Sequence, residues 1–79
     1  MTRRGFNETN MRGNFHIQVM IGTRKVNQYC SCSLHQAKAK ATILLRRMGG
    51  DKVYLRDHET HTMWARTFNS NWTREVWYG

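Results

Sequence analysis

Acidic residues are scarce in this sequence: its 79 residues include 5 Asp or Glu against 13 Lys or Arg, which gives a formal net charge of +8. Within the first 50 residues Glu8 is the single acid, whereas residues 51–79 are neutral, so the excess positive charge belongs to the first part of the chain. A one-sided positive field attracts polyanions and concentrates them on that side. The expected partner is therefore nucleic acid or a nucleic-acid-bound protein complex, and no small-molecule substrate is expected.

Long hydrophobic runs are absent as well. No apolar stretch approaches the roughly 18 residues of a membrane span, and none follows the basic residues at the N-terminus as it would in a secretory signal. We therefore expect no membrane contact and a cytoplasmic location. A chain of 79 residues buries a small core, which predicts one domain that is a monomer or a small homo-oligomer.

Cysteine occurs twice, at Cys30 and Cys32. This separation is too short for a useful disulfide loop, so the sequence predicts reduced thiols. Together with His35, His58 and His61, the cysteines supply the ligand types of a zinc site. The Cys-x-Cys spacing is unlike the usual zinc knuckle, however, and two small buried thiols beside loop histidines explain the same residues. We therefore expect no metal and no other cofactor.

Regular alternation of apolar and polar residues is present in the first half of the chain. Apolar side chains at every second position predict a strand over 15–21, and a turn leads to a second strand over 26–32. On this second strand Tyr29 faces away from Cys30 and Cys32, because successive side chains of a strand point to opposite sides. The two segments together predict a hairpin.

A helix is predicted over 33–48. Ser33 is a favourable N-cap, and Gln36 stands three residues later, which completes the pattern of a capping box. Apolar residues then recur at helical spacing. Gly49 and Gly50 end the helix, and one of them is expected to adopt the left-handed conformation.

Two further strands are predicted over 53–56 and 63–68, and the segment 72–78 is either a fifth strand or a packed tail. The order ββαββ, with or without the additional strand, predicts a single α+β domain over 15–79. In this domain an antiparallel sheet carries the helix on one face. Residues 1–14 show no periodicity and predict a flexible basic arm.

The predicted helix contains no acid between Ser33 and Met48, although exposed helices usually mix charges to gain pairs at i,i+4. This composition favours a surface that contacts phosphates or acidic side chains. The alternative is a solvated face with no partner. The candidate contact residues come from the helix, the preceding turn and the arm: Arg24, Lys25, Lys38, Lys40, Arg46, Arg47, Arg3 and Arg4.

Aromatic residues alternate with cations in the last third of the chain. On a strand Tyr54 and Arg56 would point the same way, as would Trp64 and Arg66. Such groups stack on bases, neutralise phosphates or anchor a protein partner. Tyr54, Trp64 and Arg66 are therefore candidate anchors. The alternative for Trp64 is a place in the core, because a small domain needs its tryptophans inside.

Catalytic groups are sparse. Asp57, His58, Glu59 and His61 form the one dense cluster of ionisable residues. All of them come from a single predicted loop, without a glycine-rich phosphate cradle or a second pair of carboxylates. A polar turn explains this cluster better than a nuclease site does, so no enzyme activity is expected.

The succession of elements has a counterpart among known proteins. A hairpin, a helix opened by Ser33-Leu34-His35-Gln36-Ala37-Lys38-Ala39 and, after Gly50, a second hairpin ending in Met63-Trp64-Ala65 together resemble very small phage-encoded early proteins, including anti-CRISPR proteins with a ββαββ core. The resemblance covers about two-thirds of the chain and carries over no functional residue. It implies a protein that blocks a host enzyme or surveillance complex by binding it, in the cytoplasm of a host bacterium.

Many such inhibitors are acidic and imitate DNA, whereas a basic chain would bind nucleic acid or an acidic protein surface. A fainter likeness to the N-terminal DNA-binding domains of phage integrases covers the arm with Arg3 and Arg4, but here the cations concentrate on the helix and the turn. The sequence therefore predicts a basic, non-enzymatic phage-type inhibitor that engages a nucleic-acid-handling complex through its positive helix face. The alternative is direct, weakly sequence-specific binding of double-stranded DNA or RNA.

Overall fold

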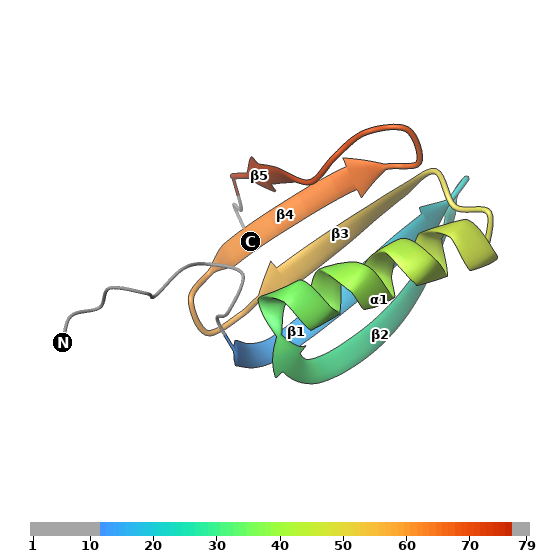
Figure 1. Cartoon of the computed structure of the whole chain (residues 1–79). Helices are drawn as coiled ribbons and strands as arrows, with labels where there is room; N and C mark the ends of the chain where they lie inside the picture. Colours follow the sequence, from blue (N-terminus) through green and yellow to red (C-terminus); the bar gives the residue numbers. More distant parts are fainter. Residues whose placement is uncertain (1–11, 77–79) are drawn as a thin grey trace, which may run out of the picture.

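The computed structural model describes residues 12–76 and confirms the predicted α+β fold (Figure 1). Its elements follow in the order β1 (Arg12–Ile21), β2 (Arg24–Ser33), α1 (Leu34–Arg47), β3 (Lys52–Asp57), β4 (Thr62–Thr67) and β5 (Thr73–Glu75). The optional fifth strand is therefore present, although it is shorter than the predicted segment 72–78. Within residues 12–76, no helix is long and apolar enough to cross a membrane.

The first strand begins at Arg12, three residues before the predicted start at 15. The reason is the length of its partner, because the last residues of β2 provide a pairing position for each added residue. Arg12 pairs with Ser33, and Asn14 pairs with Ser31. The prediction of an arm over 1–14 is thus wrong for its last part. Its remainder, with Arg3 and Arg4, lies outside the described residues.

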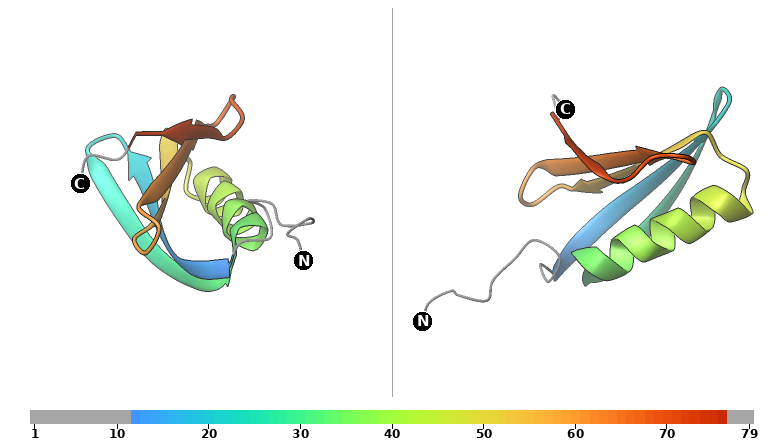
Figure 2. Two further views of the ribbon diagram at one scale, coloured as in Figure 1. Left: turned by 90° about the vertical axis from the view of Figure 1, so that its left-hand side faces the viewer. Right: turned by 45° about the horizontal axis from the view of Figure 1, so that its top comes forward.

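The strands form one sheet in the order β2-β1-β3-β4-β5, in which every neighbouring pair is antiparallel. The helix α1 packs on one side of this sheet, over β1, β2 and β3, and no helix of residues 12–76 lies on the opposite side (Figure 2). We call these the helix side and the open side. The core lies between α1 and the sheet and consists of Phe15, Ile17, Val19, Cys32, Leu34, Ala37, Ala41, Leu45, Val53, Leu55 and Trp64.

The predicted start and end of the helix are confirmed. The Gln36 backbone N–H donates to Ser33 Oγ at 3.2 Å, and the Ser33 backbone N–H donates to Gln36 Oε1 at 3.1 Å, which is a complete capping box. At the other end Gly49 has a φ of 65°, a conformation that glycine adopts without steric cost. Gly22 has a φ of 62° and makes the tight turn between β1 and β2 in the same way.

Asp51 ties the turn between β1 and β2 to the connection that follows the helix. The Gly22 backbone N–H donates to Asp51 Oδ2 at 2.7 Å, and the Asp51 backbone N–H donates to the Met20 carbonyl at 2.8 Å. These two bonds fix where the chain leaves the helix and enters β3. Asp51 therefore has a structural role at this end of the sheet.

Replacing Gly50 by Ala is expected to destabilise the fold. A Cβ atom at this position would lie 2.6 Å from Val19 Cγ1 and 3.2 Å from the Met20 carbonyl oxygen. Both neighbours belong to β1, which is paired on both edges and has little freedom to move. We expect Gly50→Ala to lower the free energy of unfolding by about 1–3 kcal/mol in urea denaturation. Gly49→Ala is a comparison with a different cause, since a Cβ there meets nothing within 4 Å and its cost of about 1 kcal/mol comes from the positive φ alone. A loss well below about 1 kcal/mol in Gly50→Ala would refute the steric explanation.

Cys30 and Cys32 are joined by a disulfide bond, so the prediction of reduced thiols is wrong. Residues two apart on a strand point to the same side, and the Cα atoms of this pair are 5.7 Å apart, within the range of about 4.4–6.8 Å that disulfides span. Cys32 is buried in the core, and Cys30 is partly buried and packs against the core. The closed loop holds one intervening residue, so the bond restricts the unfolded chain only slightly.

Candidate nucleic-acid interface

The helix α1 presents four cations, and its 14 residues hold no acid. Lys40, Arg46 and Arg47 are exposed, whereas Lys38 is partly buried. The cations lie along both flanks of the helix, since residues three or four apart share a flank. Lys38 lies on the flank that faces β4, and Arg46 follows it two steps of four residues later; Lys40 with Arg47 lies on the flank that faces β2.

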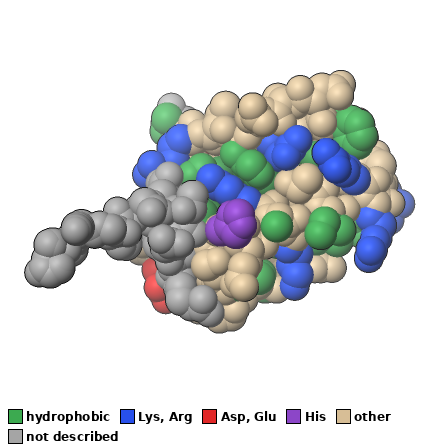
Figure 3. All heavy atoms as spheres, viewed as in Figure 1, with side chains coloured by type: hydrophobic (Ala, Val, Ile, Leu, Met, Phe, Trp, Pro, Cys, Tyr) green, Lys and Arg blue, Asp and Glu red, His purple; other side chains and the backbone are tan. Residues whose placement is uncertain are grey.

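Three strands add further cations to the helix side. Arg74 pairs with Trp64, Trp64 pairs with Leu55, and Leu55 belongs to the core, so all three side chains share the helix side. By the same alternation Arg66 and Arg24 point to this side from β4 and β2. Figure 3 shows this side with Lys and Arg spread across it and acidic side chains visible only at its lower left edge.

Among the strand and helix residues that the structure describes, Asp57 is the one carboxylate on the helix side. Its side chain is 2% exposed, and its Oδ1 accepts the backbone N–H groups of Glu59 and Thr60 at 3.0 and 3.5 Å. A carboxylate that is buried and occupied in this way neither pairs with a surface cation nor repels an approaching anion strongly. The exposed charged side chains that the described strands and helix present on the helix side are therefore all positive.

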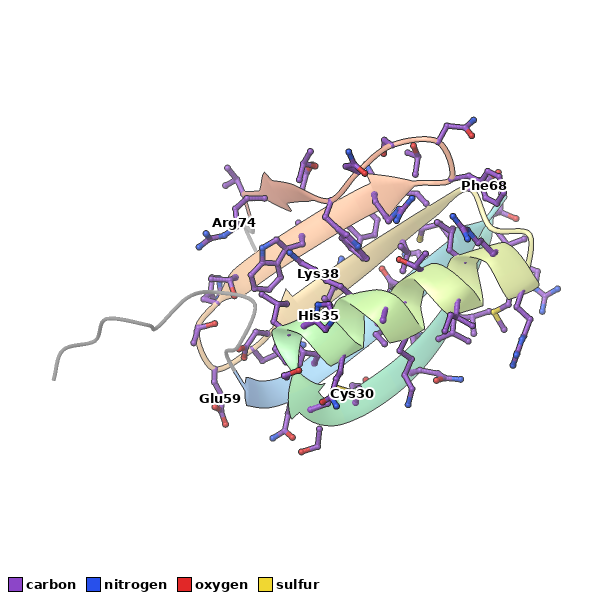
Figure 4. All side chains as sticks on the ribbon, in the orientation of Figure 1. Cys30, His35, Lys38, Glu59, Phe68 and Arg74 are labelled. Atoms are coloured by element: carbon purple, nitrogen blue, oxygen red, sulfur yellow. A yellow bond between two sulfur atoms is a disulfide. The ribbon has the colours of Figure 1, made fainter. Side chains whose placement is uncertain are left out.

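Trp64 lies beneath two of these cations. Lys38 Nζ is 5.7 Å and Arg74 Cζ is 5.6 Å from the centre of the Trp64 ring, which are distances of cation–π contacts. Figure 4 shows Lys38 on α1 and Arg74 on β5 on the same side of the sheet. The indole itself is 2% exposed, so Trp64 belongs to the core and is not an exposed anchor. It holds Lys38 and Arg74 at the surface.

Arg66 joins the same cluster from β4. Its Nη1 donates to Thr42 Oγ1 at 3.3 Å, and its Nε donates to the Thr67 carbonyl at 3.3 Å. The first bond links β4 directly to the helix. Since guanidinium groups keep their charge at any physiological pH, this position of Arg66 adds fixed positive charge between α1 and the edge of the sheet.

A groove of about 460 Å³ runs along the opposite flank of the helix, between α1 and β2. Its lining includes Ile43, which is 54% exposed, and the cations Lys40 and Arg47. The groove is also lined by Gln28, Gln36, Ala39 and Leu44. A lining of apolar and cationic side chains suits an acidic ligand that carries an apolar group.

Residues that the sequence grouped together lie on different sides of the sheet. Arg24 lies on the helix side, whereas Lys25, the next residue of β2, lies on the open side. Tyr54 and Arg56 share the open side, as predicted, and Arg66 lies on the helix side with Trp64. The predicted contact residues are therefore divided between two surfaces.

The residues of the zinc hypothesis do not form a site. Both cysteine sulfurs are engaged in the disulfide, and residues 12–76 contain no group of three or more His, Cys, Asp or Glu side chains arranged to hold a metal ion. His35 is exposed in the first turn of α1, whereas His58 lies 5.9 Å, centre to centre, from the ring of His16 on the open side. Asp57 accepts hydrogen bonds from the backbone N–H groups of its own loop, at Glu59 and Thr60.

Sequence reasoning missed several residues that the fold brings to these surfaces. His16, Gln18, Asn27 and Lys52 occupy open-side positions, and only the alternation of β1, β2 and β3 indicates their common orientation. Arg74 lies over Trp64 because β5 pairs with β4. The short strand β5 offered little signal from which this pairing would follow.

Comparison of the chain with known protein families, curated proteins and solved structures found no match to any of them.

Proposed function

We propose that this protein is a non-enzymatic protein that binds double-stranded nucleic acid, and that it does so by contacting phosphates with its helix side. One observation carries the proposal. Cations from β2, α1, β4 and β5 converge on one side, and the described strands and helix offer no exposed carboxylate there. Contacts of this type give affinity and strong salt dependence with little sequence preference.

The shape of the helix side supports this proposal. The 14 residues of α1 give a helix about 21 Å long, and cations border it on both flanks. Ala39 and Ile43 lie on the exposed ridge between the flanks. Two rows of cations separated by a ridge without charge match the two rows of phosphates that border a groove of a duplex, and the major groove is wide enough to admit a helix.

Some of these cations are already positioned in the unbound protein. The Trp64 ring holds Lys38 and Arg74, and Thr42 holds Arg66. Fixing a long side chain before binding reduces the conformational entropy that is lost on binding. The cluster around Trp64 is therefore the part of the helix side best suited to a tight phosphate contact.

The salt dependence of binding tests the proposal. A labelled DNA or RNA duplex is titrated with the protein at about 50 and about 200 mM salt. Contact with about four phosphates predicts that the affinity falls about 100-fold between these conditions, because each contact contributes about 0.9 to the slope of log K against log salt. A flat salt response, or no binding at the lower salt concentration, would reject duplex binding.

The groove between α1 and β2 favours a second candidate function. Its exposed Ile43, together with Lys40 and Arg47, suits a protein surface that offers an apolar group among acids. This is the contact that a phage-type inhibitor of a nucleic-acid-handling complex would need. Absence of duplex binding at about 50 mM salt, together with capture of a host protein that is lost on Ile43→Glu, would favour this function.

A further inference from the structure

The open side carries aromatic, amide and basic side chains in rows that cross the strands. Residues that pair between neighbouring strands lie side by side about 4.8 Å apart. Two rows that cross β2, β1 and β3 are the row of Tyr29, His16 and Arg56 and the row of Asn27, Gln18 and Tyr54. These six side chains form the centre of the open side.

An aromatic stack occupies one end of this centre. The rings of His16 and Tyr29 are 4.9 Å apart, centre to centre, and within 15° of parallel, and His58 lies 5.9 Å from His16. Tyr29 is nevertheless 74% exposed. One face of its ring rests on His16, so the other face is presented to solvent as the end of an unfinished stack.

A pair of cations occupies the other end. Lys52 Nζ is 5.0 Å and Arg56 Cζ is 5.1 Å from the centre of the Tyr54 ring. Arg56 Nη1 also donates to Gln18 Oε1 at 3.3 Å. Tyr54 is thus covered by the two cations that it positions, and Arg56 is held by two partners.

Amide groups connect the stack to the cations. Gln18 Nε2 donates to Asn27 Oδ1 at 3.2 Å, and Asn27 Oδ1 lies 2.8 Å from His16 Nε2. The chain of contacts therefore runs without interruption from Tyr29 through His16, Asn27, Gln18 and Arg56 to Tyr54. Such a network orders the surface before a ligand arrives.

The charge of the open side selects an anionic ligand. Lys25, Lys52 and Arg56 lie on it, and among the strand residues that the structure describes Glu75 is the one carboxylate at an open-side position. Glu75 lies on the edge strand β5, where its Oε2 accepts the hydroxyl of Thr73 at 3.1 Å. Three strand spacings, about 14 Å, separate β5 from β1 and thus Glu75 from His16.

We infer that the open side is a second binding site and that its occupant is a single-stranded polynucleotide. A base stacks on the exposed face of Tyr29 and extends the Tyr29–His16 stack, while Arg56 and Lys52 neutralise the adjacent phosphates. Arg56 lies two strand spacings, about 10 Å, from Tyr29, within the reach of neighbouring nucleotides. The amides of Asn27 and Gln18 lie between these points and can meet base edges.

The exposure of Tyr29 distinguishes this site from a plain solvated surface. A tyrosine that served folding would bury its ring, and this one leaves most of it in water on an edge strand. A duplex hides the faces of its bases inside the stack, whereas unpaired bases offer theirs, so an exposed ring beside cations selects the single-stranded form.

The test compares Tyr29→Ala with Tyr29→Phe. Each protein is titrated against a labelled oligouridylate and a labelled oligodeoxyuridylate of about 12 nucleotides, which differ in the sugar alone, at about 50 mM salt. Because the stack needs the ring and not the hydroxyl, Tyr29→Ala should weaken binding about 5- to 150-fold and Tyr29→Phe should bind like the wild type. Tighter binding of one oligomer then shows whether the site prefers RNA or DNA, and either preference supports the site.

Three results would overturn the inference: no binding of either oligomer by the wild type, equal binding by Tyr29→Ala, or an equal loss in both variants. The duplex titration of the same variants separates this site from the helix side. Tyr29→Ala should leave duplex affinity unchanged, and Lys40→Gln with Arg47→Gln should lower single-strand affinity much less than duplex affinity. Since the two sites lie on opposite sides of the sheet, either proposal can fail while the other stands.

Discussion

Replacing Lys40 and Arg47 together by glutamate is expected to lower the affinity for duplex nucleic acid about 100-fold at about 50 mM salt. Each phosphate contact on B-DNA contributes about 0.9 to the salt slope, which corresponds to about tenfold in affinity at this concentration, and Lys40→Glu with Arg47→Glu removes two contacts. Both side chains are exposed on α1, so the fold should be retained. The affinity is measured by titration of a labelled duplex, and the fold by circular dichroism.

The matched control places the same charge change on the opposite side of the sheet. Lys25→Glu with Lys52→Glu also removes two cations and adds two acids, so both double variants lower the formal net charge from +8 to +4. If contact on the helix side determines binding, the control should lose much less affinity. An equal loss in both would show that the overall field of the protein, and not its helix side, attracts the duplex.

Truncation of Trp64 to alanine is expected to remove most of the stability of the domain. Its ring is 2% exposed, contacts the core with Phe15 at 6.5 Å between ring centres, and is covered by two cations. Replacing a buried Trp or Phe by Ala usually costs about 3–5 kcal/mol, and small domains have about 5 kcal/mol or little more in total. We expect urea denaturation to show Trp64→Ala largely unfolded or close to unfolding.

Two control variants test whether the loss of stability comes from the place of the Trp64 ring in the core. Tyr29→Ala removes an aromatic ring that is 74% exposed, and it should change the free energy of unfolding by less than about 0.5 kcal/mol. Trp64→Phe keeps a ring in the core and should cost less than Trp64→Ala. A loss below about 1 kcal/mol in Trp64→Ala would contradict the assignment of this residue to the core.

Local sequence signals were sufficient for most of the fold. The alternation over 15–21 and the capping box of Ser33 and Gln36 act within a few residues, so strand and helix followed directly from them. The start of β1 at Arg12 and the extent of β5 depend instead on partners that are distant in sequence. Pairing of this kind leaves no local pattern.

The sides of the sheet were harder to assign than its strands. Val53 and Leu55 alternate with Tyr54, which places Tyr54 outward, whereas Met63, Trp64 and Ala65 are all apolar and give no alternation. Only the register between β3 and β4, with Leu55 opposite Trp64, shows that Trp64 faces the helix. The two aromatic–cation pairs consequently lie on opposite sides, although their sequence patterns look alike.

The disulfide was missed for a different reason. The length of the loop between two cysteines determines how much a bond restricts the unfolded chain, but the distance between them in the fold determines whether the bond forms. Cys30 and Cys32 close a minimal loop and still lie 5.7 Å apart at Cα. The distance between these two positions on β2 is therefore enough for the bond to form, although the bond is expected to add little stability.

The order of strands in the sheet also affects how the chain folds. Within residues 12–76, the pairs β1–β2, β3–β4 and β4–β5 join strands that follow one another, whereas β1–β3 joins strands separated by β2 and α1. Contacts between nearby residues form early, because closing a short loop sacrifices less chain entropy than closing a long one. Pairing of β3 with β1 is therefore the step expected to limit the folding rate, and the hydrogen bond from Gly22 to Asp51 spans this same closure.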